Sequence, residues 1–186
     1  MHMKSLLISL FFIITVISAK GQPNDKVAST PALGHDWRAG VINITELNTG
    51  LGIALVNEPY ARNYFGITTV NGYQFTRNIK AGVGLGFQIH NGGTLFPLYL
   101  DARYSLNAQE FVPFFAAAGG VLFSLQEFNS DSRIFINPSL GLKWVTTNKI
   151  GLSFSTGVLV AAGGSDRDSF VNFKLGIEFK GKEWNR

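Results

Sequence analysis

The chain has 186 residues, a formal net charge of +4 and no cysteine. This length suits one domain, and the absence of cysteine excludes disulfides, thiolate metal sites and an acylated cysteine anchor. Hydrophobic residues make up 46% of the chain and charged residues 15%, and this charged fraction is too low for an ordinary soluble domain. The net positive charge is too small to indicate a nucleic-acid partner.

The N-terminal segment predicts export rather than part of the fold. Lys4 provides a positive start, residues 6–17 are almost all apolar, and residues 19–21 offer small side chains for cleavage. We therefore expect a signal peptide over residues 1–21. Residues 22–36 are polar and contain two prolines, which predicts a flexible periplasmic leader.

The rest of the chain has no candidate for a membrane-spanning helix. Its most apolar stretch, residues 111–123, contains Pro113, Gly119 and Gly120, and a spanning helix needs about 20 apolar residues. The apolar surface is therefore spread over many short segments, which favours membrane-spanning strands.

Four segments alternate apolar residues with polar or small ones at the period of a β-strand. The clearest is residues 79–90, where the odd positions are apolar and the even positions are glycine or polar. The same pattern occurs in residues 96–106, 134–144 and 171–179.

Four further strands are expected with less regular patterns. They cover residues 47–55, 64–76, 111–123 and 150–160. The faces of 64–76 are ambiguous and allow a bulge. Segment 111–123 is apolar on both faces, and a hairpin that pairs Asn107 with Glu110 would turn Phe111 and Phe115 outward.

The connectors alternate in length, as in outer-membrane barrels. Short turns are expected at residues 77–78, 107–110 and 146–148. Longer loops are expected at residues 56–63, 126–132 and 163–168, and the connector at 90–94 belongs with these loops although it is the shortest of them. We predict an all-β fold, an eight-stranded antiparallel transmembrane up-and-down β-barrel over residues 37–180. A short tail follows at 181–186. The even number of strands places both termini of the barrel at the periplasmic side, and the longer loops lie outside the cell.

Several runs resemble small outer-membrane β-barrel proteins of the Bacteroidetes, which are porin-like eight-stranded barrels of the OmpX and OmpA kind. The runs are NITELN (43–48), FGITTVNGY (65–73), FPLYLDARY (96–104), FINPSLG (135–141) and NFKLG (172–176). The resemblance covers about residues 37–179 and implies an outer-membrane protein, while it says almost nothing about function. One departure is that Phe179 is followed by further residues, whereas such barrels usually end on an aromatic residue.

Six charged residues fall at inward positions of the predicted strands, namely Lys80, Asp101, Arg103, Lys143, Lys174 and Glu178. An eight-stranded barrel has an interior that side chains just fill, so we expect a salt-bridge network that plugs the lumen. Lys80, Arg103, Lys143 and Glu178 should cluster near the periplasmic end. Inward glycines, among them Gly84 and Gly151, should leave room for the long side chains.

An alternative is a narrow, weakly anion-preferring pore, because four inward bases face two inward acids. A lipid-modifying enzyme is a weaker alternative, since the exported chain offers only His35 and His90, without a neighbouring nucleophile or an orienting acid. We expect no catalytic residue, no metal site and no cofactor. A soluble lipocalin-like binder would need the opposite phase, with its apolar face inside.

Aromatic residues gather toward both ends of the predicted strands, as in the two belts of membrane barrels. Tyr64, Phe135 and Phe170 are among those expected at the outer belt, and Tyr73 and Trp144 among those at the inner one. The expected partners are outer-membrane lipid and the outer-membrane assembly machinery, and the barrel is expected to be a monomer in the outer membrane with a structural or surface-interaction role.

Overall fold

The computed structural model describes residues 38–53, 62–91, 93–106, 110–124, 132–146, 150–163 and 166–181. The predicted signal peptide and leader lie outside the described residues, as does the predicted tail beyond Gly181.

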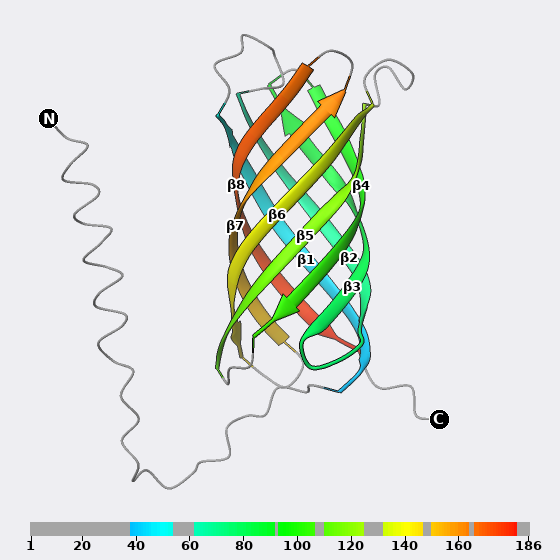
Figure 1. Cartoon of the computed structure of the whole chain (residues 1–186), viewed down its shortest axis with the longest axis vertical. Coiled ribbons are helices and arrows are strands. Elements are labelled where there is room, and N and C mark those ends of the chain that lie inside the picture. The colour runs from blue at the N-terminus through cyan, green and yellow to red at the C-terminus, as the bar shows by residue number, and fades with distance from the viewer. Residues whose placement is uncertain are drawn as a thin grey trace, which may run out of the picture. The chain divides into compact units, whose positions relative to one another are not determined.

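Eight strands form a closed antiparallel barrel, in which each strand pairs with the next and β1 pairs with β8. The strands cross the barrel wall obliquely in Figure 1. Their bounds are β1 Gly40–Gly52, β2 Asn63–Gln74, β3 Ile79–His90, β4 Gly93–Ser105, β5 Phe111–Ser124, β6 Arg133–Val145, β7 Ile150–Gly163 and β8 Asp166–Lys180. The predicted fold class is confirmed. No helix among the described residues is long and apolar enough to cross a membrane.

The outer wall is apolar, and the predicted phase of the regular strands is confirmed. Leu100 is 69% exposed and Leu140 is 59% exposed, although both would be buried in a soluble domain. The neighbouring positions Asp101 and Ser139 point inward and are buried. In β5 the outward phase of Phe111 and Phe115 is as expected.

The ambiguous second strand is regular. Its even positions, including Tyr64, Thr68 and Val70, are buried inside the barrel. Its register with β1 and with β3 is unbroken, so β2 contains no bulge.

The register also fixes the stagger of the barrel. The stagger is found by starting at Gly40 on β1 and moving from each residue to its partner on the next strand. After one circuit of the barrel this path returns to β1 at Gly50, ten residues further along the strand. The stagger and the strand number together set the width of a barrel, and eight strands enclose a space that side chains can fill. The intermediate pairs run through Gln74, Lys80, Arg103, Ala116, Ser139, Gly157 and Asn172.

The barrel has two ends, which we name by what meets there. At the terminus rim, β1, β3, β5 and β7 begin and β2, β4, β6 and β8 end. At the loop rim, β1, β3, β5 and β7 end and β2, β4, β6 and β8 begin.

Two predicted boundaries are wrong. β1 begins at Gly40 rather than at Leu47. The predicted loop at 163–168 is mostly strand, because Gly163 pairs with Asp166 and Ala161 pairs with Asp168. The polar run there resembles a solvated loop in the sequence, but the side chain of Asp168 turns inward and is buried.

Candidate functional site

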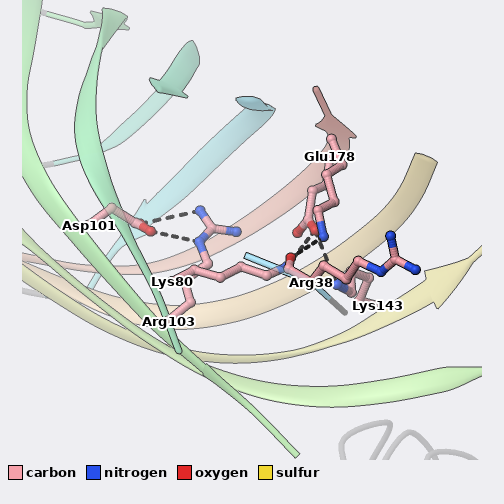
Figure 2. Close-up of polar contacts among 7 residues, drawn as sticks. Arg38, Lys80, Asp101, Arg103, Lys143 and Glu178 are labelled. Atoms are coloured by element: carbon pink, nitrogen blue, oxygen red, sulfur yellow. Dashed lines mark hydrogen bonds and ion pairs between the residues drawn. The ribbon is translucent and has the colours of Figure 1, made fainter. Parts of the chain in front are cut away.

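Toward the terminus rim, a three-residue ion cluster crosses the lumen. The ammonium groups of Lys80 on β3 and Lys143 on β6 both donate to Oε1 of Glu178 on β8, the second over 3.2 Å. All three residues are at most 5% exposed. Figure 2 shows these side chains reaching toward one another from separate strands. The cluster therefore ties distant parts of the wall together through the interior.

Beside this cluster, Arg103 is clamped by two carboxylates. Its Nε and Nη2 donate to the two oxygens of Asp101 over 2.7 and 3.2 Å, and Nη2 lies 3.0 Å from Oε1 of Glu46. Its guanidinium carbon is 5.7 Å from the ring centroid of Phe114. Such bidentate pairing holds a buried guanidinium in one geometry. Lys174 lies within electrostatic range of Glu46, Asp101 and Arg103.

All six charged residues singled out in the sequence point inward and are buried. Lys80, Arg103, Lys143 and Glu178 line one small enclosed space near the terminus rim. Asp101 and Lys174 lie deeper along the lumen, on the side of the Arg103 clamp.

The sequence reasoning missed four further charged groups. Glu46 and Lys180 also point inward, and near the loop rim Arg133 forms an ion pair with the buried Asp168. Glu46 was missed because the first half of β1 reverses the usual pattern, with Ile42 and Ile44 inside. The described lumen thus holds six bases and four acids rather than four and two. The bases are Lys80, Arg103, Arg133, Lys143, Lys174 and Lys180, and the acids are Glu46, Asp101, Asp168 and Glu178.

Near the loop rim, the interior is filled by rings. Tyr64 stacks on His90 with centroids 5.1 Å apart, and Phe170 meets both edge-on at 5.3 and 5.9 Å. Asn172 Nδ2 donates to the Tyr64 hydroxyl over 3.3 Å. Tyr64, Phe135 and Phe170 therefore belong to an internal aromatic layer, and their assignment to the outer belt is wrong, because all three occupy inward positions.

Two inward tyrosines lie over glycines of the neighbouring strand. Gly50 pairs with Tyr64, Gly84 pairs with Tyr99, and a Cβ on either glycine would overlap the facing ring. The expectation that inward glycines make room for long charged side chains holds for Gly151, which lies against Lys143, but not for Gly84. An aromatic ring over a glycine covers backbone that would otherwise lack side-chain contacts.

Between the ionic and aromatic layers lies a small polar chamber with a volume of about 20 Å³. The amide oxygens of Asn48, Gln88 and Asn137 line it and have no hydrogen-bond partner among the described residues. Lys174 also borders it. This volume suits a single buried water, which needs two or more polar partners.

The enzymatic alternative depends on His90 and on Asp101, the nearest inward acid in the sequence. Asp101 pairs with Gly82, eight residues away from His90 along β3. At a strand rise of about 3.3 Å per residue this is roughly 26 Å, so Asp101 does not orient the His90 ring. Among the described residues, no group of three or more metal-ligating side chains is placed to hold an ion.

This arrangement places side chains across the interior at two levels. Ion pairs bridge the lumen at one level and stacked rings fill it at another, while the side chains between them are mostly buried. An apolar outer wall around a charged interior is typical of small eight-stranded transmembrane β-barrels.

Comparison with solved structures finds three similar barrels, of which the first supports this fold. The Neisserial surface protein A, NspA, superposes with a TM-score of 0.57 at 12% identity, over 77% of this chain and 99% of NspA. The N-terminal β-barrel domain of Pseudomonas aeruginosa OprF gives 0.46 at 16% identity, over 76% of this chain and 100% of that domain. A de novo designed transmembrane β-barrel has a TM-score of 0.49 at 15% sequence identity, over 78% of this chain and 99% of the designed chain. No family model and no curated protein matches the sequence.

Proposed function

We propose that the protein is an integral outer-membrane barrel with a closed lumen and a structural or surface-interaction role. We also propose that it is not an enzyme. Its lipid-facing surface is the apolar wall, the terminus rim faces the periplasm, and the loop rim faces the outside of the cell.

The outer wall supports the membrane location. Outward residues such as Leu85, Leu100, Leu140 and Leu175 are each at least 52% exposed, and bilayer hydrocarbon is the solvent in which such a surface is stable. A soluble barrel of the lipocalin type carries its apolar side chains inside, whereas this interior holds ten charged groups. A closed sheet also leaves no unpaired backbone edge in lipid.

The single observation that carries the closed lumen is the bridge from Lys80 and Lys143 to Glu178. It joins three strands across the interior. The ring layer of Tyr64, His90 and Phe170 fills a second level. These two filled levels in series support the proposal of a closed lumen.

The alternative is a narrow passive pore, which the surplus of two inward bases would make anion-preferring. The resemblance of the sequence runs to Bacteroidetes barrels supports a source in that group. Lipid and the outer-membrane assembly machinery are the partners that such a protein needs, and the connections at the loop rim are its contact surface for other molecules.

Fractionation tests the location. The protein should be recovered in the outer membrane and migrate faster in gels before boiling than after it, because a closed barrel resists detergent. Recovery from the soluble periplasm would overturn the membrane proposal.

Planar-bilayer recording tests the closed lumen. The purified barrel should give no steady conductance across the voltage range that the bilayer tolerates. A steady, anion-selective conductance would replace the closed-lumen proposal with the pore.

A further inference from the structure

One part of the outer wall is polar instead of apolar. Asn43 and Thr45 on β1 face Asn71 and Thr69 on β2 as direct register partners. Asn43 Nδ2 donates to Asn71 Oδ1 over 2.8 Å and to Thr69 Oγ1 over 3.0 Å, and the Thr45 hydroxyl donates to Asn43 Oδ1 over 3.2 Å. We call these four residues the Asn/Thr patch.

The patch lies inside the apolar band rather than at its border. Tyr73 on β2 is an outward aromatic residue next to the terminus rim, where aromatic side chains mark the membrane interface. Asn71 and Thr69 are two and four residues further toward the middle of the barrel, so the patch begins about 7 Å beyond Tyr73 along the strand. Leu47 and Ile67 continue the wall beyond it as apolar residues.

Two other outward hydroxyls donate to nearby backbone carbonyl oxygens. Thr49 donates to the carbonyl oxygen of Tyr64, and Thr156 donates to the carbonyl oxygen of Asn172. The patch differs, because the side-chain nitrogen of Asn71 has no hydrogen-bond partner among the described residues and Asn71 is exposed. Placing an unpaired amide in hydrocarbon costs free energy. A polar partner at the same depth of the membrane would therefore stabilise this surface.

We propose that the Asn/Thr patch is the contact surface for a second copy of this chain in the membrane. This inference rests on the proposed membrane location. Two copies inserted in the same direction are related by a twofold axis along the membrane normal, so residues at one depth meet the same residues of the other copy. A surface of amides and hydroxyls suits such a contact, because each amide both donates and accepts.

The chemistry of the patch favours a copy over a lipid headgroup. Its four side chains are neutral, whereas phosphate recognition uses Lys or Arg. In the contact, the free N–H groups of Asn71 donate to an amide or hydroxyl oxygen of the facing patch. The sequence-based expectation of a monomer did not take this patch into account.

Disulfide crosslinking tests the proposal cleanly, because the chain has no cysteine. Val83→Cys on β3 places the thiol beside the patch without removing its amides, because Val83 is the outward register partner of Asn71. It should form a disulfide-linked dimer when native outer membranes are oxidised. Leu140→Cys on β6 is the matched control, since it is also outward but lies across the barrel from the patch in the strand order. Several-fold more dimer at position 83 than at 140 is expected.

Removing the polar groups should weaken the contact. An Asn43→Leu/Asn71→Leu variant with wild-type heat-modifiable migration should show several-fold less dimer by energy transfer between labelled copies in vesicles. Equal crosslinking at both positions, or no crosslinking at position 83 in a heat-modifiable barrel, would overturn the dimer. In either case the membrane proposal would stand, because recovery of the protein in the outer-membrane fraction tests it independently.

Discussion

Lys80 and Glu178 are 98 positions apart in the chain and hydrogen-bond across the barrel interior. Their strands, β3 and β8, are not neighbours, because β1 and β2 lie between them. The contact therefore cannot come from the sheet ladder and depends on closure. Glu178 balances two lysines at once, which makes it the central residue of the ionic layer.

Neutralising Glu178 should destabilise the barrel strongly. Glu178→Gln keeps the side-chain shape but leaves Lys80 and Lys143 without their shared carboxylate, and breaking a buried pair costs about 3–5 kcal/mol. Urea unfolding in lipid vesicles measures the loss. Glu110→Gln, at an exposed position, is the control and should change stability little. Equal stability of the two variants would show that the cluster contributes nothing.

Charges on the outer wall should be costly in proportion to their depth. Leu140→Arg places a cation near the middle of the wall and should cost about 2–4 kcal/mol, whereas Ile134→Arg next to the loop rim should cost roughly 0–1 kcal/mol. Both residues are outward. Unfolding titrations in vesicles measure the difference. The same cost at the two positions would argue against a bilayer around this wall.

Filling the space over Gly84 should strain the interior. Gly84→Ala drives a methyl group into the Tyr99 ring, and overpacking of this kind costs about 1–3 kcal/mol. Gly119→Ala is the control, because its Cβ would meet its neighbours at 3.6 and 3.9 Å, which is ordinary contact. In a double-mutant cycle, Tyr99→Ala should relieve the strain. Additive effects of the two substitutions would mean that the ring and the glycine are not coupled.

Removing one filled level should not open the lumen. Tyr64→Ala/Phe170→Ala takes away most of the aromatic layer but leaves the ion cluster in place, so bilayer recordings should remain silent. Adding Lys80→Ala, Lys143→Ala and Glu178→Ala should produce conductance, provided that the barrel remains heat-modifiable. Conductance in the aromatic variant alone would show that the ionic layer does not close the lumen.

The sequence alone determined the strand number, the closed topology and the faces of the regular strands. These features follow from local rules, because side chains alternate along any strand and apolar surface must face lipid. Segment 79–90 matches β3 residue for residue. The inward positions of Lys80, Asp101 and Glu178 followed from the same alternation.

Only the tertiary structure decided which inward groups meet. The inward position of Glu46 was not predicted, because Ile42 and Ile44 reverse the pattern of β1. The inward position of Asp168 was not predicted, because its sequence resembles a loop. The stacking of Tyr64 on His90 and the outward Asn/Thr patch depend on the registers of β2 with β3 and of β1 with β2. The pairing of Arg103 with Glu46 depends on the stagger of the closed sheet. That stagger sets which residues of distant strands lie at one height, and no local sequence pattern encodes it.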